Sequence, residues 1–331
     1  MSRLDLIRYF APIAHELSAV EDELAAALRS DVAVVKKLAA HVGGGKGKRL
    51  RPALVLLCCR MCGAELREGV RFGVVFELVH TATLLHDDVI DHASTRRGKP
   101  TLNTVWGNTL TVLFGDLLYL TSMSAAIAGR SFRMLEIMAE VTTRMIEGEL
   151  IQNDCLYNLE TTRKDYFDIQ ERKTALLFSG CTETAGVLAA RPEADCQALH
   201  RYGLELGRAF QLVDDLLDYT STSEQLGKPV FSDLREGKLT LPMLTLLERE
   251  PAMVRPLVER IWSTGPGAAI PPGLEADLRG LLERHDAYAE TRDLARRASA
   301  AAVEALGAVQ GHSRTRKLLL EVPEFLLSRS S

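Results

Sequence analysis

Sequence signals for β-strands are almost absent from this chain. Runs that alternate Val, Ile, Thr or Tyr with polar residues are few, and Asn-Gly hairpin turns do not occur. Apolar residues recur instead at helical spacing along the 331 residues. The sequence therefore predicts an all-α protein.

The chain also lacks a large excess of either charge sign, and it lacks long apolar runs. The formal net charge is -4, and no Lys/Arg run is interleaved with aromatics, so we expect no nucleic-acid partner. No stretch approaches the roughly 20 uninterrupted apolar residues of a spanning helix, so we expect no transmembrane segment. Residues 1–17 have the pattern of an amphipathic helix rather than a cleavable signal. We therefore expect a cytoplasmic protein.

Of the six cysteines, Cys59 and Cys62 have the CxxC spacing of zinc and redox sites. No second pair or His cluster follows at finger-like spacing, and both lie in a run of Leu, Val and Met. We therefore predict reduced thiols in the core.

Five long segments have helical spacing and carry apolar residues on more than one face. They are residues 70–91, 101–128, 132–156, 163–189 and 196–219. The sequence also predicts breaks in helical structure at 43–48, near Gly98, at 190–195, near Gly227 and at 264–273. Several segments exceed the average globular helix of about 11 residues. We therefore predict a single helical domain over residues 1–331, with a substantial interior.

Two acidic motifs have the same spacing. In LLHDDVIDHASTRRGKP, Asp87, Asp88 and Asp91 share one face of a helix, because positions i, i+1 and i+4 do. FQLVDDLLDYT repeats the spacing with Asp214, Asp215 and Asp218. One such motif is ordinarily a solvated helix end. Two of them facing each other would repel strongly unless divalent cations lay between them.

The ligand chemistry of these motifs favours magnesium. Oxygen donors with no Cys or His cluster nearby suit a hard ion, and Mg²⁺ usually shares its coordination with substrate phosphates. Polar residues near the motifs fit a phosphorylated substrate: His80 and Gln211 lie on the carboxylate faces. Basic residues lie in the flanking loops, namely Lys48, Arg49, Arg51, Arg96, Arg97, Lys228 and Lys238. Two basic groups indicate two anionic substrates, one held through metal and one by direct contacts.

The chain resembles the trans-isoprenyl diphosphate synthases, or polyprenyl synthetases. The resemblance rests on GKRLRP, LLHDDVIDHASTRRGKPT, ERKTALLF, FQLVDDLLD and LGKPVFSDLREGKLTLP, in that order, over about residues 47–242. It implies an isoprenoid synthase type I fold, a helical bundle around a deep central cavity, working as a homodimer. It also implies about three Mg²⁺ ions per active site, with isopentenyl diphosphate and an allylic prenyl diphosphate as substrates.

The resemblance assigns roles to individual residues. It implies metal binding by Asp87, Asp88, Asp91, Asp214, Asp215 and, more loosely, Asp218. The diphosphate of isopentenyl diphosphate is assigned to Lys48, Arg51, His80 and Arg97. The allylic diphosphate is assigned to Arg96, Lys173, Lys228 and Lys238. Thr174 and Gln211 match positions beside the reacting carbons, and Gln152 matches a polar position facing the cavity. The catalytic set is then Asp87, Asp88, Asp91, Arg96, Lys173, Asp214 and Lys228.

Small residues below the first motif predict a long product. Thr83, Ala82 and Val79 precede Asp87 on its helix, and the family stops elongation early with bulky aromatics at the positions of Ala82 and Thr83. Met123 and Met138 are candidates for the cavity floor. The motif set is most similar to octaprenyl-type synthases that make quinone side chains, with peripheral membrane association expected for product release.

Three other functions stay open. A shorter-chain synthase of the geranylgeranyl type belongs to the same family. A terpene cyclase shares the fold, although its second motif normally mixes Asn, Ser or Thr with Glu. A non-catalytic regulatory subunit would usually lose one acidic motif, and this chain keeps both.

Overall fold

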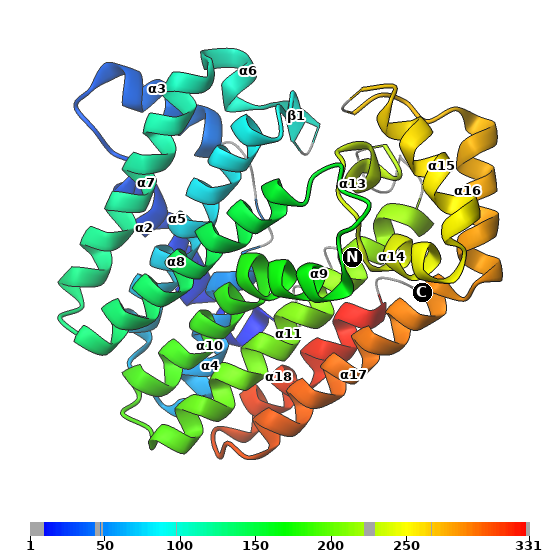
Figure 1. Ribbon diagram of the computed structural model, residues 1–331. Helices are drawn as coiled ribbons and strands as arrows, with labels where there is room; N and C mark the ends of the chain where they lie inside the picture. Colours follow the sequence, from blue (N-terminus) through cyan, green and yellow to red (C-terminus); the bar gives the residue numbers. More distant parts are fainter. Residues whose placement is uncertain are drawn as a thin grey trace. The chain divides into compact units, whose positions relative to one another are not determined.

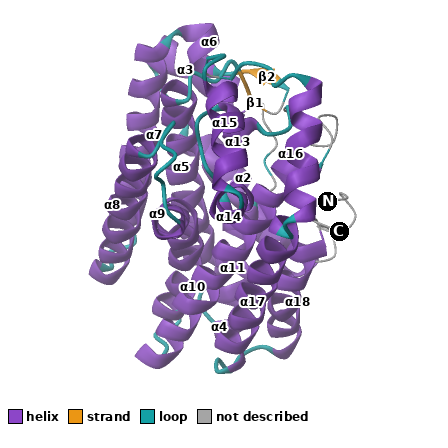
Figure 2. Cartoon of the chain, turned by 45° about the vertical axis from the view of Figure 1, so that its right-hand side comes forward, coloured by secondary structure: helices purple, strands orange, loops and turns teal. Residues whose placement is uncertain are grey.

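The computed structural model describes residues 10–43, 47, 49–96, 98–221, 229–265 and 267–328. Helices account for almost all of the secondary structure in these ranges, together with one two-stranded hairpin (Figure 2). The predicted all-α class is confirmed.

The chain divides into two compact units. The first unit contains Met1–Thr142, Phe178–Gly203 and Ala305–Leu320, and the second contains Thr143–Leu177, Leu204–Glu304 and Glu321–Ser331. The single domain over residues 1–331 stays a prediction.

The first unit is built mainly from the N-terminal helices and a short hairpin. These elements are η1 (Ala11–Ile13), α2 (Ala14–Ala27), α3 (Ala33–Gly43), α4 (Leu50–Cys62), α5 (Leu66–Ile90), β1 (Thr95–Arg96), β2 (Lys99–Pro100), α6 (Leu102–Trp106) and α7 (Asn108–Ala128). Helix α5 packs beside both α4 and α7. Figure 1 shows α5 and α7 side by side. Every residue of α4 from Pro52 to Cys59 is buried, as its uninterrupted apolar sequence requires.

The second unit has its own apolar core. Its helices include α9 (Arg163–Gln170), α13 (Ser232–Arg235), α14 (Leu241–Arg249), α15 (Pro251–Trp262) and α16 (Pro272–Arg284). Fully buried Tyr219, Phe231 and Leu278 belong to this core. The guanidinium of Arg163 fastens α9 by hydrogen bonds to Glu248 at 2.7 Å and Thr245 at 2.9 Å.

Five helices have residues in both units. They are α8 (Phe132–Asp154), α10 (Leu176–Leu188), α11 (Glu193–Thr220), α17 (Ala287–Gly307) and α18 (Ser313–Leu327). Helices α5, α8 and α11 lie within a few residues of the segments predicted at 70–91, 132–156 and 196–219.

Two of the predicted helices are interrupted. The prediction of one helix over 101–128 is wrong, because Gly107 separates α6 from α7 with φ 82° and ψ 161°, a conformation that only glycine adopts readily. The predicted helix over 163–189 contains a π-helical turn, η2 (Glu171–Ala175), between α9 and α10. The predicted turn near Gly98 joins β1 to β2, with Thr95 opposite Pro100 and Arg96 opposite Lys99.

Most of the cysteines are core thiols. All six are free, and all except the half-buried Cys155 are buried. Within the described ranges, no group of three His, Cys, Asp or Glu side chains forms a ready metal site. The prediction of reduced core thiols at Cys59 and Cys62 is confirmed.

Helix α7 is the one described helix that is long and apolar enough to cross a membrane, by length and composition alone. One third of its apolar window is buried, and core helices of globular proteins pass the same test. The expected absence of a transmembrane segment therefore stays a prediction.

Candidate active site

The first aspartate motif forms the C-terminal end of α5. Asp91 is the C-cap residue, and its amide donates to the carbonyl of Asp87 at 2.8 Å. The motif therefore shares one helical turn, as its spacing predicts. Its carboxylates differ in environment, because Asp88 is 3% exposed while Asp87 and Asp91 are half-buried.

Arg96, in the basic segment that follows this acidic motif, pairs with one of its aspartates. The β1–β2 hairpin turns back toward the helix end, and Arg96 Nε donates to Asp88 Oδ1 at 2.7 Å. Burial raises the pKa of Asp88, and the charge and hydrogen bond of Arg96 oppose that rise. Asn103 of α6 also donates to the backbone carbonyl of Asp88 at 3.1 Å. The structure thus brings together Asp88 and Arg96, both predicted site residues.

The second aspartate motif lies in the last two turns of α11. Asp214 is exposed, whereas Asp215 and Asp218 are 2% and 1% exposed. Asp218 Oδ2 accepts from the amide of Asp233 at 3.2 Å, which attaches the segment around α13 to α11.

A chain of hydrogen bonds holds Asp215. Thr174 Oγ1 donates to Gln211 Oε1 at 2.9 Å, and Gln211 Nε2 donates to Asp215 Oδ1 at 2.7 Å. The hydroxyl of Tyr166 donates to Asp215 Oδ2 at 2.5 Å. Three predicted site residues, Thr174, Gln211 and Asp215, therefore form one network.

The electrostatics of Asp215 fit a cation ligand. The pKa of Asp215 is raised to about 8, chiefly by burial and also by the charges of Asp233 and Asp214, against the opposing effect of the donors Tyr166 and Gln211. A raised pKa favours the neutral acid, whereas a bound cation would favour the ionised carboxylate, whose two oxygens can each accept a second contact. Oxygen donors of this kind suit Mg²⁺.

The π-helical turn presents Lys173 and Thr174. Such turns occur frequently at functional sites, because they shift the side chains out of regular helical phase. Lys173 Nζ forms an ion pair with Glu149 of α8 at 2.5 Å, and Gln152 donates to the same carboxylate at 3.2 Å. A Cβ at Gly148 would lie 2.8 Å from the side chain of Arg172 and 3.0 Å from the amide of Lys173. Glycine therefore allows α8 to approach this turn.

The structure describes three more of the predicted substrate-binding residues, and each of them has a different environment. The guanidinium of Arg51 lies 5.2 Å from the ring centroid of Phe178. His80 is half-buried on α5, two turns before Asp87. Lys238 Nζ pairs with Glu236 at 2.9 Å. Three predicted residues, Lys48, Arg97 and Lys228, lie outside the described residues.

The predicted chain-length residues all lie on α5. Val79 and Ala82 are 2% and 3% exposed, and Thr83 is half-buried, with its hydroxyl donating to the carbonyl of His80 at 2.9 Å. Of the floor candidates, Met138 is 1% exposed and Met123 is half-buried. Their role in product length stays a prediction.

Three residues of the site were missed by the sequence analysis. Asp233 could have been noticed, since it is an acidic residue inside the matched block LGKPVFSDLREGKLTLP. Tyr166 lies 49 positions from Asp215, and no spacing rule pairs them. Glu149 is one of several acidic residues on α8, and only the fold selects it as the partner of Lys173.

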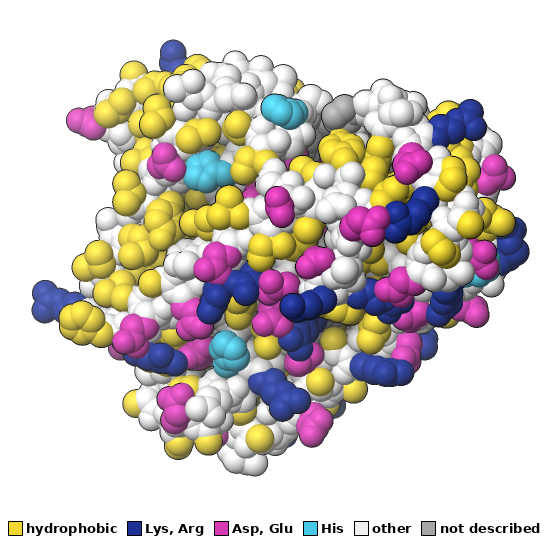
Figure 3. Space-filling model, viewed as in Figure 1, with side chains coloured by type: hydrophobic (Ala, Val, Ile, Leu, Met, Phe, Trp, Pro, Cys, Tyr) yellow, Lys and Arg dark blue, Asp and Glu magenta, His cyan; other side chains and the backbone are white. Residues whose placement is uncertain are grey.

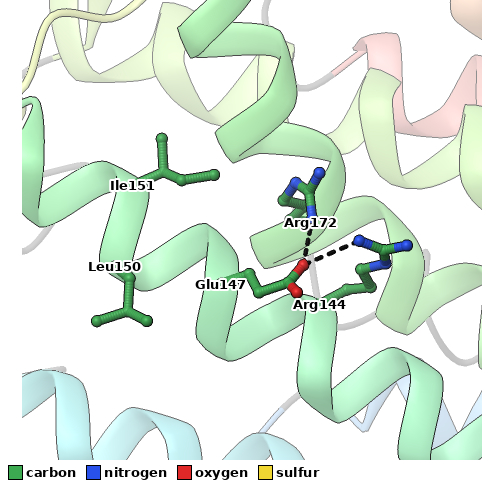
Figure 4. Close-up of a pocket in the computed structure, with 5 residues that line it drawn as sticks. All are labelled: Arg144, Glu147, Leu150, Ile151 and Arg172. Atoms are coloured by element: carbon green, nitrogen blue, oxygen red, sulfur yellow. Dashed lines mark hydrogen bonds and ion pairs between the residues drawn. The ribbon is translucent and has the colours of Figure 1, made fainter.

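A shallow surface pocket lies beside the π-helical turn. It is lined by Arg144, Glu147, Leu150, Ile151 and Arg172 (Figure 4). Both guanidinium groups are directed toward Glu147, which partly neutralises them. None of the predicted site residues lines this pocket, so we do not assign it to the active site.

Comparison with known proteins identifies the family of this chain. Residues 32–266 match the polyprenyl synthetase family. The chain is 38% identical to the octaprenyl diphosphate synthase of Escherichia coli (strain K12) over 251 residues, covering 75% of this chain and 78% of that protein.

Solved structures agree in fold. The decaprenyl diphosphate synthase of Rhodobacter capsulatus has a TM-score of 0.91 and 34% identity, covering 98% of this chain and 99% of the other. The polyprenyl synthase of Caulobacter crescentus CB15, in complex with calcium and isoprenyl diphosphate, has a TM-score of 0.89 and 33% identity, with 98% of each chain covered.

The chain has the all-α isoprenoid synthase fold, as the resemblance implied. It belongs to the polyprenyl synthetase family, and the predicted enzyme class, a prenyltransferase, is confirmed.

Proposed function

We propose that the protein is a trans-polyprenyl diphosphate synthase. It condenses isopentenyl diphosphate head-to-tail with an allylic diphosphate, and its product has about eight isoprene units. The observation that carries this proposal is the presence of both aspartate motifs, each with a buried, hydrogen-bonded carboxylate, in a chain 38% identical to an octaprenyl diphosphate synthase.

We further propose that magnesium is the metal and that about three ions bind per active site. Polyprenyl synthases generally depend on Mg²⁺, and one structural relative contains calcium with its isoprenyl diphosphate. The oxygen donors Asp87, Asp88, Asp91, Asp214, Asp215 and Asp218 would hold the ions. When bound, Mg²⁺ withdraws negative charge from the allylic diphosphate and makes it a better leaving group.

Basic residues of the chain would assist departure of the allylic diphosphate. Lys173 and Arg96, with Lys228 and Lys238, stabilise the negative charge that develops on the departing diphosphate. Both Arg96 and Lys173 form ion pairs with carboxylates in this structure. Each side chain has further N–H donors that could bind the diphosphate beside its carboxylate partner.

The second substrate is held by a separate basic group. Arg51 and His80, together with Lys48 and Arg97, would bind the diphosphate of isopentenyl diphosphate and orient its double bond toward the allylic carbon. An apolar surrounding protects the intermediate carbocation from water. The departing diphosphate would accept the proton that is lost when the new double bond forms.

We propose a homodimer formed through α7. This helix exposes Leu113, Leu117, Leu120 and Ile127, at 57%, 39%, 60% and 57%. Apolar side chains gather on this part of the surface (Figure 3). Contiguous apolar patches on a soluble monomer commonly mark interaction sites. A cytoplasmic location, peripheral membrane contact for product release and a role in quinone side-chain synthesis remain expectations.

The activity is tested by incubating purified protein with Mg²⁺, labelled isopentenyl diphosphate and each of a series of allylic primers, and sizing the products by chromatography. The proposal predicts products of about eight units. Products that stop at about four units would support the geranylgeranyl-type alternative, and cyclised hydrocarbon would support a terpene cyclase.

A further inference from the structure

Arg49 belongs to the basic motif GKRLRP, yet its side chain is directed toward carboxylates of the protein. Its Nε and Nη2 atoms donate to the two oxygens of Glu21 on α2 at 2.5 and 3.0 Å. Its Nη1 atom donates to Glu77 Oε1 on α5 at 2.7 Å. The same guanidinium therefore contacts two helices of the first unit, α2 and α5.

Both partners of the Arg49–Glu77 pair are constrained. Glu77 is 6% exposed, so its charge depends strongly on compensation by Arg49. Arg49 has a left-handed backbone, with φ 50° and ψ 35°, which residues with a Cβ adopt rarely. The ion pairs hold this conformation at the residue that immediately precedes α4.

The pair lies next to two groups assigned to the same diphosphate. Arg51 is two residues after Arg49, in the first turn of α4. His80 is three residues after Glu77, about one turn further along α5. The Arg49–Glu77 contact therefore links the start of α4, which carries Arg51, to the part of α5 that carries His80.

We propose that Arg49 and Glu77 are positioning residues that fix Arg51 and His80 at the separation needed for the diphosphate of isopentenyl diphosphate. The inference rests on the proposed function and extends it to residues that do not touch the substrate. Because misplacement of a binding group by about 1 Å can cost up to about 100-fold in rate, loss of the pair should weaken use of this substrate.

The test compares Arg49→Met, Arg49→Lys, Glu77→Gln and the double variant Arg49→Met with Glu77→Gln. We expect Arg49→Met to raise the KM for isopentenyl diphosphate by about tenfold, equivalent to about 1.4 kcal/mol. The KM for the allylic primer should change less than twofold. Arg49→Lys keeps the positive charge but loses the planar guanidinium that contacts both glutamates. It should therefore give a smaller increase in the KM for isopentenyl diphosphate. The double variant should be no worse than Arg49→Met, since the two residues act as a pair.

Arg60→Met is the matched control. Arg60 is also on α4, and it pairs with Glu16 of α2 at 3.5 Å rather than with Glu77. This variant should keep both KM values. Thermal melting of every variant, and calorimetric titration with isopentenyl diphosphate alone, separate loss of folding from loss of binding.

Equal increases in both KM values, or an unchanged affinity for isopentenyl diphosphate in folded Arg49→Met, would overturn the inference. Failure of the proposed function would look different, because the unmodified protein itself would then form no prenyl product.

Discussion

At the scale of single residues, we expect the orientation of the Asp215 carboxylate to depend on the hydroxyl group of Tyr166. Tyr166 donates to one oxygen of this buried carboxylate, and we expect it to fix the orientation in which Asp215 meets a cation. Such supporting hydrogen bonds are typically worth about 10–100-fold in metal affinity. Tyr166→Phe should therefore raise the Mg²⁺ concentration for half-maximal activity by about tenfold.

Tyr288→Phe is the control for that measurement. The hydroxyl of Tyr288 is buried and makes no hydrogen bond to any described residue, so its removal should leave the magnesium requirement unchanged. An unchanged requirement in Tyr166→Phe would show that the hydroxyl does not support the metal site.

The sequence predicts which aspartates matter but not how they differ. The i, i+1, i+4 spacing correctly placed each motif on one helical face, because that depends on helix geometry alone. Asp88 and Asp215 are buried, and their hydrogen-bond partners Arg96 and Tyr166 are brought to them by a hairpin and by α9. Spacing within a motif contains no information about such partners.

The thiols should differ in reactivity. Burial raises the pKa of Cys58, Cys59 and Cys181 above the ordinary value and raises that of Cys62 to about 11. A raised pKa leaves less thiolate at pH 8, and thiolate is the reactive form. Cys155 is only half-buried, although burial also raises its pKa.

We therefore expect Cys155 to react first with a thiol reagent at pH 8, and the other five cysteines to react after unfolding in guanidinium. The Cys155→Ser variant should lack the first phase. Rapid modification of several thiols in the folded protein would contradict the buried positions described above.

At the scale of elements, long helices were predictable and their interruptions were not. Segments 70–91, 132–156 and 196–219 were found because apolar periodicity persists over many turns. The break at Gly107 needs one residue with a special backbone conformation, and a single glycine inside an apolar segment does not reveal it. The π-helical turn at 171–175 changes the phase of Lys173 and Thr174 through its hydrogen bonding, with no distinctive residue type.

Helix α5 carries the prediction about product length. Ala82 is small and 3% exposed, about one turn before the first motif. Ala82→Phe should shorten the main product by several isoprene units, because the ring would occupy space along the proposed elongation path. Chromatographic sizing measures this, and Ala82→Val should give an intermediate length.

The melting temperature of both Ala82 variants serves as a check, since a large side chain in a packed position typically costs about 1–3 kcal/mol of stability. An unchanged product distribution in folded Ala82→Phe would mean that the elongating chain does not pass this face of α5.

At the scale of the whole molecule, the exposed face of α7 predicts self-association. Leu113 and Leu120 are seven residues apart and share a helical face. Replacing both with Glu should convert a dimer into a 36.5 kDa monomer in sedimentation analysis, because buried unpaired charges would destabilise the interface. Val303→Glu, at another exposed apolar position on α17, should leave the dimer intact. A dimer that survives the double replacement would exclude α7 as the interface.

The central claim is that both aspartate motifs bind the magnesium that activates the allylic diphosphate. Its most direct test is turnover of labelled isopentenyl diphosphate by Asp87→Ala and by Asp214→Ala, with helicity followed by circular dichroism. Asp293→Ala, at a half-exposed position on α17, is the control. We expect each motif variant to lose turnover while keeping its helicity, and the control to retain both. Full activity in either folded motif variant would contradict the account.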